Sequence, residues 1–163
     1  KWMALLGMVI LLGSALFLVG CGNTGGQAGS KNQGQAEQSA LFENLDNAPV
    51  TIDSAQVQKA PLYNDVPIHY TNRTDKFITK IEFALLLFDQ EGKPAIDSHS
   101  QSSLKRISTK KQLAPQASGS GVWNVTMDAF KMKVRLARVE YLDGSTWEDP
   151  DIQQWVEQEI AKF

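Results

Sequence analysis

Few side chains in this sequence of 163 residues are suited to metal binding or redox chemistry. It contains one cysteine, Cys21, and two histidines, His69 and His99. A zinc site needs at least three protein ligands at suitable spacing, and two histidines in separate segments do not supply them. One cysteine cannot form an internal disulfide. The sequence therefore predicts no metal site and no cofactor, and it favours surface or hydrogen-bonded positions for both histidines.

One serine lies in a setting that resembles part of a nucleophile motif, Gly119-Ser120-Gly121. It lacks the full G-x-S-x-G pattern and the strand-to-helix turn that exposes a catalytic serine. General acid–base catalysis also needs a positioned partner, and the sequence indicates none. We therefore predict that the protein is not an enzyme and that this segment is a turn.

Four acidic residues near the carboxy terminus could supply oxygen ligands to Ca²⁺. They are Asp143, Glu148, Asp149 and Asp151. The alternating D-x-D-x-D-G loop of calcium sites is missing. A solvated turn followed by a helix start is the favoured interpretation.

Basic residues gather in the segment 105–138, although the net charge of the whole chain is -2 and does not suggest a nucleic-acid partner. Lys131, Lys133 and Arg135 would share one face of a strand. Together with Arg138 they form a candidate surface for anionic lipid headgroups or cell-wall polymers. The alternative is that acidic neighbours in the fold neutralise these charges.

The amino terminus has the layout of a secretory signal peptide. Residues 2–20 carry no charge and follow Lys1. The closing residues, Leu18-Val19-Gly20-Cys21, resemble the lipobox of bacterial lipoproteins. That resemblance implies cleavage before Cys21 and a diacylglyceryl (palmitate-type) anchor on its thiol. An uncleaved signal anchor is the alternative, because the apolar segment approaches the length of a membrane-spanning helix.

These features predict three segments. Residues 1–20 form the signal peptide, residues 21–40 the lipidated cysteine and a flexible linker, and residues 41–163 one extracytoplasmic domain. The linker expectation rests on residues 22–39, which are rich in Gly, Gln, Asn and Ser and have no aliphatic side chain larger than Ala. Such a composition buries too little apolar surface to offset the entropy of ordering.

Short β-prone segments separated by turns predict an antiparallel immunoglobulin-like β-sandwich. We expect strands near 50–58, 66–72, 77–89, 104–111, 121–127 and 133–142. Asp149-Pro150-Asp151 precedes a helical pattern of Ile152, Trp155, Val156 and Ile160.

The segment 77–89 is apolar on both faces of the expected strand. Such a strand needs cover on both sides, and the carboxy-terminal helix could cover one of them. Two positions are open for Trp155. It could be buried against the core, or it could belong to an exposed docking face.

The middle of the chain also resembles the FxLYD-type domains of bacterial surface lipoproteins. The resemblance is carried by Asn72, Leu85-Leu86-Leu87-Phe88-Asp89, Gly92, Leu113-Ala114-Pro115 and Trp123, with Leu in the Phe position and Phe in the Tyr position of the naming motif. It implies a sandwich fold and a surface location, and no known activity.

The sequence thus favours a membrane-anchored, non-enzymatic binding or assembly module of the cell envelope, partnered by an envelope protein or an anionic polymer. The alternatives are an accessory subunit that docks on a membrane complex through its carboxy-terminal helix, or a binder of anionic lipid or cell-wall polymer.

Overall fold

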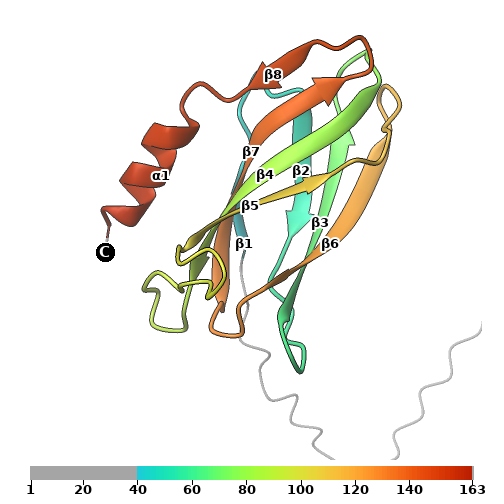
Figure 1. Ribbon diagram of the computed structural model, residues 1–163. Helices are drawn as coiled ribbons and strands as arrows, with labels where there is room; N and C mark the ends of the chain where they lie inside the picture. Colours follow the sequence, from blue (N-terminus) through green and yellow to red (C-terminus); the bar gives the residue numbers. More distant parts are fainter. Residues whose placement is uncertain (1–39, 163) are drawn as a thin grey trace, which may run out of the picture. The chain divides into compact units, whose positions relative to one another are not determined.

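A computed structural model describes residues 40–162 of the protein (Figure 1). The signal-peptide prediction, the linker prediction for residues 22–39 and the anchor prediction for Cys21 lie outside these residues. The elements are β1 (Ala40–Glu43), β2 (Val50–Ala55), β3 (Asn64–Asn72), β4 (Ile78–Phe88), β5 (Leu104–Thr109), β6 (Ser118–Val125), β7 (Lys131–Tyr141), β8 (Thr146–Glu148) and α1 (Ile152–Ile160). The predicted fold, a mainly β sandwich with a short carboxy-terminal helix, is confirmed.

Two sheets form the sandwich. One has the strand order β1-β7-β4-β5, with β8 also pairing with β7, and the other has the order β2-β3-β6. All pairs are antiparallel except β1 with β7, which run parallel. The strands β1 and β8 were not predicted, because segments of three or four residues show too little periodicity to be recognised.

Strand β4 is buried on both faces, as its sequence predicts. The side chains of Ile81, Phe83, Leu85 and Leu87 face the core between the sheets. On the outer face, Ala84, Leu86 and Phe88 pack with Trp155 and Val156 of α1, and Figure 1 shows the helix beside this sheet. The helix therefore covers the second apolar face of β4, and Trp155 is buried between the helix and the sheet.

A β-bulge changes the alternation of side chains along β7. Glu82 is opposite Arg138 and Phe83 is opposite Leu136, so Ala137 is an extra residue. Leu136 and Val139 consequently both contribute to the main core. A bulge lets two successive residues share one face of the sheet, and here it places Arg138 among the charged side chains of the outer face.

The prediction that Gly119-Ser120-Gly121 is a turn is wrong, because this segment lies within β6. A Cβ atom on Gly121 would lie 2.4 Å from the Trp123 ring. The indole Nε1 of Trp123 donates a hydrogen bond to the carbonyl oxygen of Ser108 on β5, at 3.2 Å. Glycine is needed here to let the ring lie over the strand and join two sheet edges.

Candidate functional site

The sandwich has two ends, which carry different loops (Figure 1). We call the end where β1 begins the near end, because Ala40 pairs with Met132 at the start of β7. The near end also carries the loops 56–63, 89–103 and 126–130. The opposite, far end carries the loops 44–49, 73–77, 110–117 and 142–145.

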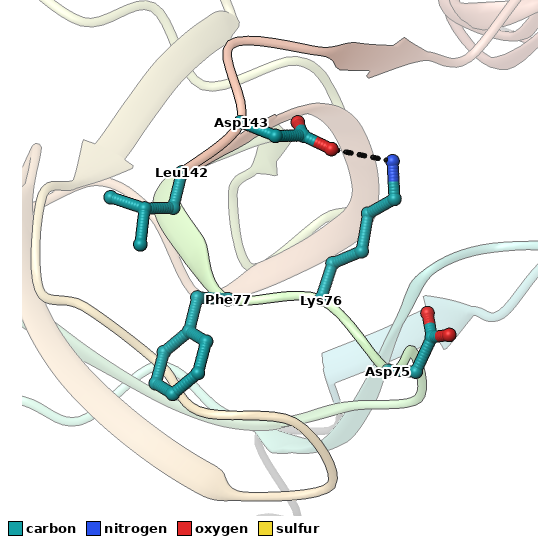
Figure 2. A pocket seen from close by; sticks show the side chains of 5 residues that line it. All are labelled: Asp75, Lys76, Phe77, Leu142 and Asp143. Carbon is teal, nitrogen blue, oxygen red and sulfur yellow. Dashed lines mark hydrogen bonds and ion pairs between the residues drawn. The ribbon is translucent and has the colours of Figure 1, made fainter.

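A surface hollow of about 370 Å³ lies at the far end, where two turns meet (Figure 2). It is lined by Asp75, Lys76, Phe77, Leu142 and Asp143, and we call these residues the far-end site. The backbone amide of Leu142 donates a hydrogen bond to the carbonyl oxygen of Phe77, at 2.9 Å. The hollow is therefore built on a backbone contact between the β3–β4 turn and the β7–β8 turn.

A charge pair borders the hollow. Lys76 Nζ lies 2.8 Å from Asp143 Oδ2. Asp143 also accepts hydrogen bonds from the amide and the hydroxyl of Ser145, at 2.9 Å and 2.5 Å. The hydrogen bond from Lys76, followed by those from Ser145, holds the pKa of Asp143 well below its usual value. The pair raises the pKa of Lys76, so both groups keep their charge over the physiological range.

Two apolar side chains lie beside this charge pair. Phe77 is 48% exposed and Leu142 is 61% exposed. Single exposed apolar residues are common on protein surfaces, but adjacent ones framed by fixed charges have the composition of an interface. The far-end site therefore offers two exposed apolar side chains and two fixed charges to the solvent.

The β3–β4 turn owes its shape to Asn72, whose side chain is fully buried. Its Nδ2 donates to the carbonyl oxygens of Lys76 and Ala114, both at 2.9 Å. Its Oδ1 accepts from the amide and the hydroxyl of Thr74, at 2.9 Å and 2.8 Å. One side chain thus fixes the turn on both of its sides and holds Lys76 and Phe77 in place.

The four basic residues predicted to meet anionic surfaces lie on the outer sheet face, and three of them have acidic partners. Lys133 pairs with Glu159 of α1. Arg138 Nη1 lies 3.0 Å from Glu148 Oε1. Lys131 is exposed at the near end.

Arg135 is buried and makes two hydrogen bonds to buried Asp149, at 2.7 Å and 3.2 Å. Its Nη1 also lies 3.5 Å from Glu43 Oε1 on β1. The structure therefore favours the alternative in which acidic neighbours neutralise these charges, for Lys133, Arg135 and Arg138.

The four acidic residues considered for Ca²⁺ do not come together. Three of them have basic partners: Lys76 for Asp143, Arg138 for Glu148 and Arg135 for Asp149. Between residues 40 and 162, no group of three or more His, Cys, Asp or Glu side chains is arranged to hold a metal ion.

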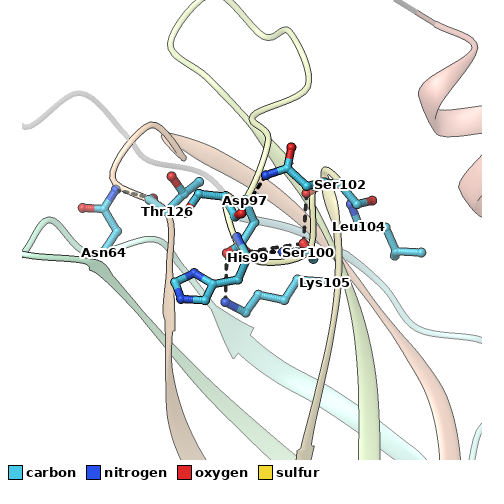
Figure 3. A network of polar contacts seen from close by, with 10 residues as sticks. Asn64, Asp97, His99, Ser100, Ser102, Leu104, Lys105 and Thr126 are labelled. Carbon is cyan, nitrogen blue, oxygen red and sulfur yellow. Dashed lines mark hydrogen bonds and ion pairs between the residues drawn. The ribbon is translucent and has the colours of Figure 1, made fainter.

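Both histidines are exposed, as predicted, with His69 on β3 and His99 in the β4–β5 connection. Buried Asp97 organises that connection (Figure 3). It accepts hydrogen bonds from the amides of His99 and Ser100, at 3.0 Å and 3.1 Å, and from Lys105 Nζ at 3.0 Å. Desolvation by itself would raise the pKa of Asp97, but the hydrogen bonds from Ser100 and Lys105 outweigh it and lower that pKa. The network is structural.

Sequence reasoning did not identify the far-end site. The sequence indicates Asp143 only as a calcium ligand or a turn residue, and it does not single out Lys76, Phe77 or Leu142. The available signal is a large apolar residue directly beside each of two turns: Phe77 follows Asp75-Lys76, and Leu142 precedes Asp143. Only the sheet register brings the two turns together.

Within the described part of the chain, no helix combines the length and the hydrophobicity needed to cross a membrane. A family model described as a family of unknown function, DUF5780, matches residues 66–162, which run from β3 through α1. No curated relative matches the chain.

Two solved structures resemble the chain. A hypothetical protein from Peptoclostridium difficile 630 superposes with a TM-score of 0.56 at 12% identity, over 70% of this chain and 92% of that chain. A DUF1425 family member from Shewanella sp. pv-4 matches with a TM-score of 0.40 at 11% identity, over 53% and 75% of the two chains. At such identity the first likeness concerns the fold alone.

Proposed function

The chain belongs to the family of unknown function DUF5780, and from this premise we propose that it is a membrane-anchored extracytoplasmic lipoprotein whose domain is a non-enzymatic binding module of the cell envelope. The family description assigns no activity. The proposed location at the membrane rests on the lipobox-like residues that end at Cys21, together with the resemblance to FxLYD-type surface domains.

The observation that carries the binding role is the juxtaposition of Phe77 and Leu142 beside the Lys76–Asp143 pair. Desolvated apolar side chains surrounded by polar groups supply most of the energy of a protein interface. The backbone here is fixed by Asn72, so binding costs little ordering entropy. The far-end site also lies opposite the near end, where a tethered chain would enter the domain.

The other two functions considered have less support. An accessory subunit that docks through its helix would need Trp155 exposed, but this side chain is buried against β4. A polymer or lipid binder that used the basic face would need free cations, but Lys133, Arg135 and Arg138 pair with acidic groups.

The test is capture of the partner in intact cells. The full chain would carry a carboxy-terminal tag, and wild type would be compared with the double variant Phe77→Ser/Leu142→Ser after crosslinking. Val122→Ser is the matched control, because Val122 is also exposed and apolar but lies on β6.

We expect one envelope protein to be captured by wild type and by Val122→Ser, and to be lost from the double variant. Equal capture by all three forms would contradict the assignment of the binding role to the far-end site.

A further inference from the structure

Exposed apolar side chains also gather at the near end, on two adjacent loops. Leu62 is 77% exposed and Tyr63 is 52% exposed at the tip of the β2–β3 loop, and Met127 is 50% exposed on the β6–β7 loop. Leu62 has the largest exposed fraction among the large hydrophobic residues of the described domain. Nothing in the fold of residues 40–162 covers these three side chains.

The two loops are held together by polar contacts. Asn64 is buried, and its Nδ2 donates to the carbonyl oxygens of Met127 and Ala129, at 3.0 Å and 2.7 Å. Lys59 Nζ donates to the carbonyl oxygen of Met127 at 3.1 Å and lies 3.4 Å from the centre of the Phe130 ring. These polar contacts hold the two loops that carry the exposed apolar side chains in place. Binding of the loops to another surface therefore costs little further conformational entropy.

The chain enters the domain at this same end. Ala40 begins β1 and pairs with Met132, directly after the β6–β7 loop, and Figure 1 shows the β2–β3 loop at this end of the sandwich. Residues 22–39 separate Ala40 from Cys21. A stretch of 18 residues can span at most roughly 65 Å even when it is fully extended. A lipid on Cys21 would thus keep these tips close to the bilayer, at a high effective concentration.

We propose that the near end rests on the membrane surface, with Leu62, Tyr63 and Met127 inserted into the lipid interface. This inference rests on the proposed lipid anchor. Tyrosine is favoured at the level of the headgroups, where its ring is buried and its hydroxyl stays hydrated. Leu62 and Met127 supply apolar area, and the ammonium group of Lys59, which lies over the Phe130 ring beside Met127, can reach the headgroups. The far-end site then points away from the bilayer.

Charge contributes little to this contact. The near end carries Lys59, Lys93 and Lys131, but Asp89, Glu91 and Asp128 line a separate hollow of about 360 Å³ at the same end. Since both signs are present, attraction to anionic headgroups is offset. Insertion should therefore depend on apolar burial and not on the charge of the lipid.

The test uses the full lipidated chain, in which the anchor occupies the thiol of Cys21. Leu62→Cys then supplies the only free thiol for an environment-sensitive fluorophore, and Met127→Cys gives a second near-end position. Leu142→Cys at the far end is the matched control, because it is another highly exposed leucine. The labelled proteins are reconstituted into phosphatidylethanolamine/phosphatidylglycerol vesicles that contain a nitroxide-labelled lipid, and the quenching of fluorescence is measured.

We expect quenching at positions 62 and 127 to be at least about twofold stronger than at position 142, because interfacial segments lie some 5–10 Å deep. Replacing phosphatidylglycerol by phosphatidylcholine should leave this difference unchanged. Equal quenching at the three positions, or a difference that disappears without anionic lipid, would overturn the inference and leave the anchor intact.

The wild-type protein distinguishes a failure of this inference from a failure of the proposed lipid anchor. If wild type floats with the vesicles and takes no label, Cys21 is lipidated. If it does not float and its thiol reacts, the lipid anchor is contradicted, and the inference is overturned with it.

Discussion

The amide of Leu142 and the carbonyl oxygen of Phe77, 2.9 Å apart, join two turns that are distant in sequence. The neighbouring Lys76–Asp143 pair spans 67 residues. These two contacts place the exposed apolar pair and the charge pair at one end of the sandwich. The composition of this site follows from the sheet register, because neither turn has a functional motif of its own.

Breaking the buried ion pair between Arg135 of β7 and Asp149 should destabilise the domain. Asp149→Ala leaves the Arg135 guanidinium buried with only the more distant Glu43 nearby. An unpaired buried charge of this kind costs about 3–5 kcal/mol. Urea titration would measure the free energy of unfolding. The matched control is Asp143→Ala, which removes an exposed pair and should lower the free energy of unfolding much less. Equal losses from the two variants would contradict the importance given to burial.

Gly121→Ala should destabilise the β6 edge. The new methyl group would lie 2.4 Å from the Trp123 ring, so the ring must move and its hydrogen bond to Ser108 is lost. Overpacking of this kind costs about 1–3 kcal/mol. Ser120→Ala, at an exposed position on the same strand, should change the free energy of unfolding by less than about 0.5 kcal/mol. A Gly121→Ala protein as stable as wild type would show that the ring is not held over the strand.

Removing the aromatic cover from β4 should expose an apolar face. Trp155→Ala uncovers Leu86 and Phe88, and deletion of a buried tryptophan side chain costs about 3–5 kcal/mol. Gln154→Ala is the control, since Gln154 is exposed on the same helix. Binding of a hydrophobic dye should rise for Trp155→Ala and stay unchanged for Gln154→Ala. Unchanged stability and dye binding in Trp155→Ala would indicate that the helix is dispensable to the fold.

Acid should destabilise the domain through Asp97 and Glu159. The folded-state pKa of each is lowered: burial opposes ionisation, but hydrogen bonds from Ser100 and Lys105 outweigh it for Asp97, and those from Lys133 and Lys162 for Glu159. A carboxyl group with a lowered folded-state pKa stabilises the fold above its unfolded-state pKa, and this contribution is lost as the pH falls through the folded-state pKa. The loss should therefore begin near the unfolded-state pKa values of 3.8 for Asp97 and 4.5 for Glu159, and it should continue below them.

The contribution of Asp97 can be isolated with Asp97→Asn. This variant should be less stable than wild type at pH 7, where the pair with Lys105 is intact in wild type. Its urea midpoint should fall less steeply than that of wild type below pH 5. An identical pH dependence of the two proteins would show that Asp97 does not contribute to acid stability.

Local patterns predicted much of this fold. The two apolar faces of β4 and the helical spacing of Trp155 and Val156 are visible in short windows of sequence, and both are confirmed. The turn prediction for Gly119-Ser120-Gly121 is wrong because glycine favours turns only as a local preference. The packing of the Trp123 ring over Gly121, together with pairing to β3, is what keeps the segment in a strand.

The candidate site was harder to predict, because it depends on contacts that are remote in sequence. The basic residues of β7 are visible in the sequence, but their partners come from other elements: Glu159 for Lys133 and Asp149 for Arg135. The bulge at Ala137, which turns Arg138 toward Glu148, also interrupts the simple alternation that a sequence pattern assumes.

The most direct test of the central claim is lipid attachment at Cys21. Cells that produce the full chain would be grown with a clickable palmitate analogue and then fractionated, with wild type compared with Cys21→Ser. The account predicts that wild type is labelled and recovered with membranes, and that Cys21→Ser carries no label. A wild-type protein that is recovered without label would contradict the account.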